Sequence, residues 1–142
     1  MAIIKSTSKE RDLLARLMRA EALGEGNLGM LMVGNVVANR AISDCLTFSN
    51  VNTIQQVINQ SPGGFSSINS PLFYSNPTTN EKNLADRIIK GEYYHPATHA
   101  LWFYAPGTGN ACSNTWWEQA LAGKYKNHCF YRPTSGTCKE LY

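Results

Sequence analysis

"ARLMRAEALGEGNLGMLMVGNVVANRAI", residues 15–42, predicts two helices that are separated by a short glycine turn. The second helix, expected from about Asn27 to Ile42, is apolar on most of its sides. A helix with that pattern is usually buried by the rest of its domain. Gly24 and Gly26 end the preceding helix, because glycine readily takes the backbone conformation that follows a helix. The stretch therefore predicts a buried central helix.

The helix before the glycine turn has a defined start and one apolar face. Thr7 and Glu10 have the spacing of a capping box, in which each side chain accepts a hydrogen bond from the other residue's backbone N–H. The apolar face recurs at the i, i+3, i+4 spacing of a helix and consists of Leu13, Leu14, Leu17 and Met18. We expect this stripe to point into the core.

The middle of the chain predicts two further helices around a long loop. Residues 51–59 carry Thr53 and Gln56 at capping spacing, and residues 80–90 have an apolar face. The loop between them, residues 60–79, is rich in Pro, Gly, Ser and Asn. Loops of this length are usually functional or disordered. The aromatic residues in this one favour a functional loop.

The last fifty residues have a different pattern. Short aromatic runs at 100–107 and 129–133 are typical of strands, and residues 114–123 predict a short helix. A length of 142 residues suits one compact domain. We therefore expect a single α+β domain over residues 1–142, mostly helical, with a small β part near the C-terminus.

Composition and charge exclude several classes of function. The net charge is +3 and 16% of the residues are charged, which is too little positive charge to indicate nucleic acid as a partner. A weak positive charge suits an anionic polymer such as cell wall. No run of about 18 apolar residues occurs, so we expect no membrane span. The N-terminus lacks the apolar core of a signal peptide, so we expect synthesis in the cytosol.

Four cysteines, Cys45, Cys112, Cys129 and Cys138, allow three complete pairings. We expect free thiols if the protein stays in the cytosol, and disulfides among Cys112, Cys129 and Cys138 in an oxidising place. No Cys-x-x-Cys motif occurs, and His128 beside Cys129 has no matching second pair. We therefore predict no metal site.

Two carboxylates border the glycine turn. Glu21 follows Leu17 by four residues and Leu13 by eight, so it lies at the C-terminal end of the apolar stripe. Partial burial and the negative end of a helix both disfavour the charged form of a carboxyl group. A carboxylic acid that stays protonated near neutral pH can protonate a glycosidic oxygen. Glu25 lies beyond Gly24, where we expect a solvated side chain.

The alternative for either glutamate is an ordinary solvated residue at a helix end. Most glycoside hydrolysis needs two carboxylates. One is enough when a hydroxyl of the sugar itself attacks the anomeric carbon, as the C6 hydroxyl of muramic acid can do by forming an internal anhydro ring. The sequence is compatible with both kinds of chemistry.

An ordered set of motifs covers most of the chain. They are "ARLMRAEALGEGNLGMLMVGNVVANRAI" (15–42), "VINQSPGGFSSI" (57–68), "IIKGEYYHP" (88–96), "HALWFYAP" (99–106) and "HCFY" (128–131). In this order they resemble the motifs of the bacterial cell-wall hydrolases that degrade spore cortex, the CwlJ/SleB type. Each motif is weak alone, and the ordered set is specific. The short length and the missing signal peptide resemble the CwlJ-type branch.

The resemblance implies a lysozyme-like fold, similar to that of lytic transglycosylases, and cleavage of the glycan strands of spore cortex peptidoglycan, which contain muramic-δ-lactam. It implies synthesis in the mother-cell cytoplasm, a place in the spore coat among coat proteins, and activity during germination. Calcium dipicolinate is the implied activator, and no cofactor is implied. The family's catalytic glutamate, the first of the two in its motif, corresponds to Glu21, which the apolar stripe also selects.

A groove that binds sugar rings needs aromatic platforms with polar edges. The candidates are Phe65, Trp102, Tyr104, Trp116 and Tyr131. We favour Phe65 and Tyr104, because each stands beside turn residues at the end of an element. The alternative is that these rings belong to the core, as aromatic side chains of small domains often do.

Three polar residues accompany these rings. Ser66 either donates a hydrogen bond to a sugar or caps the segment that follows it. His128 either faces the groove or bonds to a backbone carbonyl. Arg40 either holds a carboxylate, such as that of Glu21 or Asp44, or acts as a cation at a helix C-terminus. The predicted binding residues are Phe65, Ser66, Trp102, Tyr104 and His128.

Two other functions compete with glycan cleavage. A non-catalytic peptidoglycan-binding or coat-structural protein could keep the same fold. A peptidoglycan amidase or peptidase would need a zinc site or a nucleophile, and the sequence has no convincing His/Asp or Cys/His spacing for one.

Overall fold

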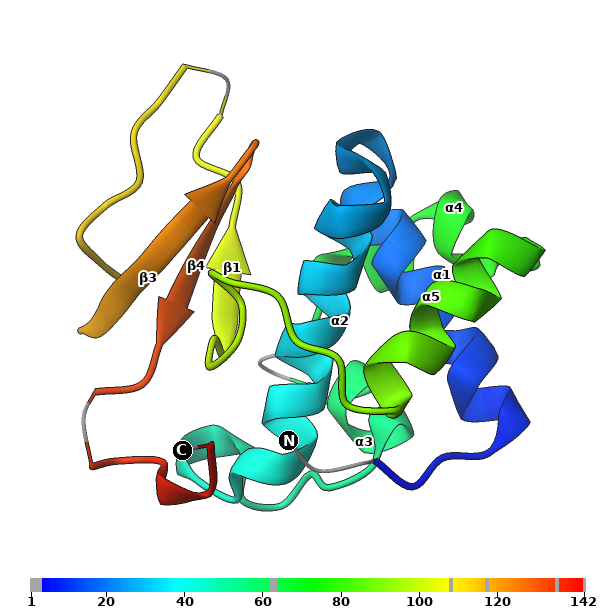
Figure 1. Ribbon diagram of the computed structural model, residues 1–142, viewed down its shortest axis with the longest axis horizontal. Coiled ribbons are helices and arrows are strands. Elements are labelled where there is room, and N and C mark those ends of the chain that lie inside the picture. Colours follow the sequence, from blue (N-terminus) through cyan, green and yellow to red (C-terminus); the bar gives the residue numbers. More distant parts are fainter. Residues whose placement is uncertain (1–3, 62–63, 108, 117, 135, 142) are drawn as a thin grey trace.

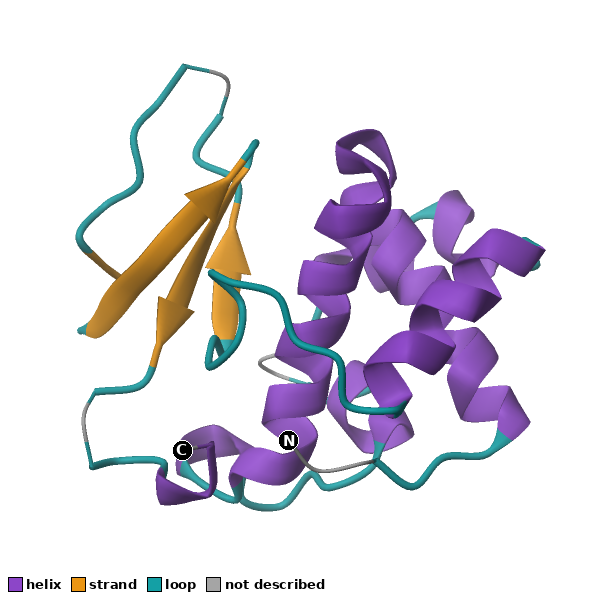
Figure 2. Ribbon diagram, in the orientation of Figure 1, coloured by secondary structure: helices purple, strands orange, loops and turns teal. Residues whose placement is uncertain are grey.

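The protein consists of a helical part and a small antiparallel sheet that lie side by side (Figures 1 and 2). The computed structural model describes residues 4–61, 64–107, 109–116, 118–134 and 136–141, except for the side chain of Trp116. Helix α2 (Gly26–Ser43) stands between the sheet and the other helices in Figure 1. The predicted α+β class is confirmed.

The helices predicted from the sequence begin close to their capping and turn signals, whereas short helices within residues 60–79 replace part of the predicted loop. Apart from α2, the α-helices are α1 (Ser8–Ala22), α3 (Ile54–Ile58), α4 (Pro71–Tyr74) and α5 (Thr79–Ile89). The capping box of α1 is formed, because Thr7 Oγ1 accepts from the Glu10 N–H at 3.1 Å and the Glu10 carboxylate accepts from the Thr7 N–H at 3.2 Å. The short 3-10 helices are η1 (Leu23–Glu25), η2 (Leu46–Phe48), η3 (Ser66–Asn69) and η4 (Lys139–Leu141).

Helix α2 is the buried centre of the molecule, as its apolar sequence predicts. Val33, Val36 and Val37 have no solvent exposure, and α2 contacts α1, α3 and α5 as well as β1 (Trp102–Tyr104). The side of α2 that faces the sheet packs with Phe130 through Met32 and Val36. None of the helices in the described ranges is both long enough and apolar enough to span a membrane.

The sheet has the strand order β1-β4-β3-β2, with antiparallel neighbours. Besides β1, the strands are β2 (Thr115–Trp116), β3 (Gln119–Tyr125) and β4 (His128–Arg132). The strands predicted within 100–107 and 129–133 are therefore confirmed. The helix predicted over 114–123 is wrong, because residues 115–116 and 119–123 belong to the strands β2 and β3, and pairing within a sheet overrides weak local helix propensity.

Two disulfides tie the C-terminal part of the chain together. Cys45 bonds to Cys138 across a separation of 93 residues, and Cys112 bonds to Cys129 across 17. Of the two alternatives for the cysteines, the structure has disulfides: Cys112–Cys129 lies within the set expected for an oxidising place, whereas Cys45 stood outside that set and pairs with Cys138. The second bond joins the segment after β1 to β4, directly beside His128.

We expect the Cys112→Ser/Cys129→Ser double variant to lose about 3 kcal/mol of unfolding free energy, which is the chain-entropy estimate for a closed loop of this length. Urea unfolding of the oxidised wild type and the double variant measures the difference. Reduction serves as the control, because reduced wild type must lose at least as much stability as the variant. A variant as stable as the oxidised wild type contradicts the prediction.

Candidate active site

Glu21 lies in the last turn of α1, where the apolar stripe ends. Leu17, one turn earlier, is fully buried, and Glu21 is half-buried. The chain then passes through η1 to Glu25 and into α2. Glu21 therefore stands at the partly solvated end of a buried helix face, as its spacing predicts.

Glu25 is buried, which corrects the expectation of a solvated side chain. Its side chain is 6% exposed and its Oε1 contacts Nδ1 of His128, whose side chain is 10% exposed. The backbone N–H of Asn127 donates to the other oxygen, Oε2, at 2.7 Å. Both carboxylate oxygens of Glu25 are therefore bound by the turn between β3 and β4 and by the first residue of β4.

Two glycines allow Glu25 to take this position. Gly26 has a φ of +76°, a conformation that suits glycine at the start of α2. A Cβ on Gly29 would lie 2.5 Å from the Cβ of Glu25, so only glycine leaves room for the glutamate against the first turn of α2. Lys126 adds a further link from the β3–β4 turn, because its Nζ donates to the backbone oxygen of Glu25 at 3.3 Å.

A row of rings continues from His128 toward Arg40. The ring of Phe103, in the middle of β1, has its centre 5.2 Å from that of His128 and 5.9 Å from that of Phe65. The guanidinium carbon of Arg40 lies 4.5 Å from the centre of the Phe65 ring. The structure therefore brings Phe65 and His128, two of the predicted binding residues, into one cluster through Phe103, which the sequence did not single out.

Arg40 lies at the other end of this cluster, and the negative charge of Glu21 acts on its guanidinium. Its side chain is buried, its Nε donates to the backbone oxygen of Leu101 at 2.8 Å, and its guanidinium also contacts Phe48. Burial lowers the pKa of the Arg40 guanidinium to about 10, and the negative charge of Glu21 acts in the opposite direction. Arg40 thus links α2 to the residue before β1, and its positive charge interacts with the negative charge of Glu21.

Strand β1 separates the other predicted aromatic residues from this cluster. Successive side chains of a strand point to opposite faces, so Trp102 and Tyr104 lie on the face opposite to Phe103. The Tyr104 ring stacks on Tyr131 with centres 5.7 Å apart, and the Trp102 ring lies 6.0 Å from Phe48. Trp102 and Tyr104 therefore cannot line the same surface as Phe65 and His128.

The remaining candidates differ in exposure. Tyr131 is fully buried and its hydroxyl donates to the backbone oxygen of Ser113 at 2.7 Å, so it is a core residue and not a platform. Phe65 is 7% exposed, whereas Ser66 is exposed at the start of η3, which has no side-chain cap. Of these residues only Ser66 is largely open to solvent. The side chain of Trp116 lies outside the described residues.

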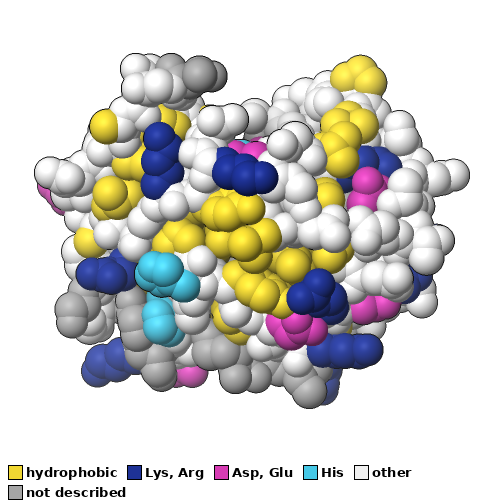
Figure 3. Space-filling model, turned by 45° about the horizontal axis from the view of Figure 1, so that its top comes forward, with side chains coloured by type: hydrophobic (Ala, Val, Ile, Leu, Met, Phe, Trp, Pro, Cys, Tyr) yellow, Lys and Arg dark blue, Asp and Glu magenta, His cyan; other side chains and the backbone are white. Residues whose placement is uncertain are grey.

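Exposed apolar side chains stand next to Glu25 in the sequence. Leu23 and Leu28, which flank Glu25 in the sequence, are 48% and 36% exposed. Figure 3 shows hydrophobic side chains gathered across the middle of one face, with Lys, Arg, Asp and Glu side chains at their border. Apolar surface with charged edges suits sugar rings. Across the described ranges, no three His, Cys, Asp or Glu side chains come close enough to hold a metal ion.

Comparison with known proteins identifies the family. Residues 24–131 match the cell wall hydrolase family. The curated cell wall hydrolase CwlJ of Halalkalibacterium halodurans is 50% identical over 142 residues, which is 100% of this chain and 98% of that protein. The chain belongs to the cell wall hydrolase family. CwlJ of Bacillus subtilis, another relative, is 43% identical over the same 142 residues and is covered to 98%.

Two solved structures share the fold of this cell wall hydrolase. The catalytic domain of Bacillus cereus SleB superposes with a TM-score of 0.71 at 25% identity, over 93% of this chain and 98% of that domain. The catalytic domain of the germination-specific lytic transglycosylase SleB of Bacillus anthracis gives 0.69 at 26% identity, over 93% of this chain and 100% of that domain. The predicted lysozyme-like fold is confirmed. The family match includes Glu25 and His128, and Glu21 stands just before it.

Proposed function

We propose that this cell wall hydrolase cleaves the glycan strands of peptidoglycan with Glu21 as general acid and then general base. The observation that supports the proposal is the difference between the surroundings of the two glutamates. Both carboxylate oxygens of Glu25 are bound by His128 and Asn127, whereas Glu21 is half-buried and partly open to solvent at the end of α1. Glu21 is therefore the member of the pair that can meet a substrate.

A single carboxylate is sufficient for a lytic transglycosylase reaction. In the proposed step the Glu21 carboxylic acid donates its proton to the glycosidic oxygen, and the bond from that oxygen to the anomeric carbon of muramic acid breaks. The C6 hydroxyl of the same sugar forms the new bond to the anomeric carbon, and its proton returns to the Glu21 carboxylate. The products are an anhydro-muramic end and a free hydroxyl on the leaving sugar, and no water is consumed.

The setting we propose is spore germination. One structural neighbour is named a germination-specific lytic transglycosylase, and the full-length relatives are CwlJ proteins. On this basis the substrate is spore cortex peptidoglycan with its muramic-δ-lactam units, and the protein acts from the spore coat after synthesis in the mother cell. Contact with coat proteins and activation by calcium dipicolinate stay predictions of the family resemblance.

Mass spectrometry of the products tests the reaction. Purified protein is incubated with cortex sacculi, and we expect the released fragments to end in anhydro-muramic acid. Reducing ends instead would show hydrolysis and would require a second carboxylate. Free amines without new glycan ends would show an amidase. No released fragment, with binding retained, would favour the non-catalytic peptidoglycan-binding or coat-structural alternative.

A further inference from the structure

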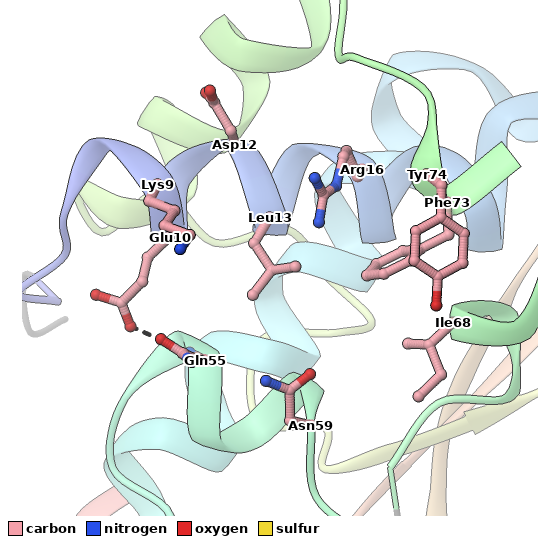
Figure 4. Close-up of a pocket in the computed structure, with 10 residues that line it drawn as sticks. All are labelled: Lys9, Glu10, Asp12, Leu13, Arg16, Gln55, Asn59, Ile68, Phe73 and Tyr74. Carbon is pink, nitrogen blue, oxygen red and sulfur yellow. Dashed lines mark hydrogen bonds between the residues drawn. The ribbon is translucent and has the colours of Figure 1, made fainter.

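The described part of the chain forms recesses that do not include Glu21, and two of them differ in charge. Figure 4 shows the first, a groove along α1 whose lining combines two carboxylates with two cations: Glu10, Asp12, Lys9 and Arg16. The second is a pocket of about 570 Å³ at the end of β4, and the described residues that line it include three basic side chains and no Asp or Glu. Of the two, the second therefore favours an anionic ligand.

The three basic side chains of this pocket come from separate segments of the chain. His99 lies in the turn before β1, Arg132 is the last residue of β4, and Lys139 is the first residue of η4. Ala120 of β3, which stands opposite Arg132 in the sheet, and Pro133 add apolar atoms to the wall. The pocket thus combines positive charge with a small apolar surface.

The charges of Arg132 and Lys139 are available to a ligand. Both residues are exposed, and within the described ranges no ion pair joins either of them to a carboxylate. Burial lowers the pKa of the His99 ring, and the positive charge of Arg132 lowers it further. Arg132 and His99 therefore lie close enough for their charges to interact. An anion bound beside Arg132 would offset this charge and raise the pKa of His99.

The backbone around the pocket is held in place by the fold. The side chain of the buried Asn39 donates to the backbone oxygens of the residues on both sides of His99, at 3.1 and 2.8 Å. The disulfide of Cys138 ties the residue before Lys139 to the segment that follows α2. Arg132 belongs to a paired strand. Because these anchors exist without a ligand, binding needs little further ordering of the backbone, which favours affinity.

The shape and chemistry of the pocket indicate a ligand larger than a bare ion. Its volume lies within the range of about 300–1,000 Å³ that is typical of small-molecule sites. A guanidinium binds carboxylate or phosphate groups through two parallel hydrogen bonds, and a lysine ammonium adds a point charge. The apolar atoms of Ala120 and Pro133 suit the carbon skeleton of a sugar-sized molecule that carries such a group.

We propose that this pocket binds a carboxylate or phosphate group carried on a sugar-sized molecule, with the anionic group at Arg132 and Lys139. Free acidic sugars and the acidic units of a wall glycan share this chemistry. The pocket lies near the C-terminal end of α2, whereas Glu21 lies near its start (Figure 1), and a helix of 18 residues is about 27 Å long. On a wall glycan the pocket would be a second point of attachment, remote from the acid. This last reading rests on the proposed function.

Titration with three hexoses that differ only at C6 tests the pocket. Glucose carries a hydroxymethyl group there, glucuronate a carboxylate and glucose 6-phosphate a phosphate. We expect wild type to bind at least one of the two charged sugars at a single site, and not glucose. Arg132→Gln should weaken this binding by about tenfold or more, because it removes a charge-assisted hydrogen bond, and Lys139→Gln should act in the same direction. Lys90→Gln, at the exposed C-cap of α5, removes the same net charge and should bind like wild type.

Two results would overturn the pocket. One is no saturable binding of either charged sugar, and the other is an affinity that Arg132→Gln leaves unchanged or that Lys90→Gln lowers equally. NMR titration of the His99 ring in wild type supplies a measurement that does not depend on the folding of a variant. We expect the bound sugar to raise the pKa of His99, and an unchanged pKa at saturation would contradict the assigned place.

Sedimentation with cortex sacculi distinguishes the two sources of the ligand. If the acidic group belongs to the wall glycan, Arg132→Gln should bind sacculi more weakly than Lys90→Gln does, and the charged sugar should compete with sacculi for wild type. Equal sedimentation of the two variants would refute the glycan and leave a free acidic sugar as the ligand. These binding measurements need no cleavage, so an inactive wild type that binds the charged sugar would refute only the proposed function.

Discussion

Glu21→Gln should lower the rate of glycan cleavage by about 10³-fold and leave the fold intact. General acid–base catalysis typically contributes 10²–10⁴-fold, and glutamine of the same shape cannot give or take the proton. Glu21 is half-buried in the last turn of α1, where a substitution that conserves volume changes stability little. Release of new glycan ends from cortex sacculi measures the rate, and urea unfolding measures the stability.

The matched control is Glu140→Gln, which makes the same chemical change at an exposed position in η4. We expect this variant to cleave at the wild-type rate. If Glu21→Gln also cleaves at that rate while remaining folded, Glu21 is not the acid. A Glu21→Gln variant that binds sacculi but does not cleave them separates the enzyme from a binding protein on the same fold.

Local signals in the sequence were sufficient for the helices that position Glu21. The capping box of α1 and the largely apolar sequence of α2 can be recognised from residues close together in the chain, without knowledge of the rest of the fold. The position of Glu21 follows from the same spacing. Strand β3 was missed because its identity depends on pairing with β4, which local propensity does not report.

The role of Glu25 could not be read from its neighbourhood. Its main partner, His128, is 103 residues away in the sequence, so no local pattern links the two. Gly26 and Gly29 carried a partial signal, because two glycines around the start of a helix suggest a close approach of another group. That signal indicates crowding near Glu25 but does not name the partner.

For the aromatic candidates, the alternation of side chains along a strand was a signal that the prediction did not use. Residues in a strand alternate between two faces, so Trp102 and Tyr104 had to lie opposite to Phe103 once the strand was predicted. Applying that rule would have removed them from the surface that holds Phe65 and His128. The contacts of the Phe103 ring with both of these residues, stacked on Phe65 and edge-on to His128, still required the fold.

Glu25→Ala should lower the free energy of unfolding by about 2–6 kcal/mol, because it leaves two buried polar groups without their partner, at about 1–3 kcal/mol for each. The carboxylate is buried and binds both the His128 ring and the Asn127 N–H, so its removal leaves two polar groups without an acceptor. It also frees the start of α2 from the β3–β4 turn. Urea unfolding of wild type and Glu25→Ala measures the loss, with Glu140→Ala as the exposed control.

A double-mutant cycle with His128→Ala isolates the pair. We expect a coupling of about 1–3 kcal/mol between the two positions, whereas additive losses would show that the contact contributes nothing. Cleavage then distinguishes the two glutamates. In the proposed mechanism Glu25 supports the site and exchanges no proton with substrate, so its alanine variant should retain cleavage per folded molecule, whereas Glu21→Gln should stay folded and inactive. A Glu25→Ala protein that is fully folded yet inactive would reverse the assignment and make the buried glutamate the acid.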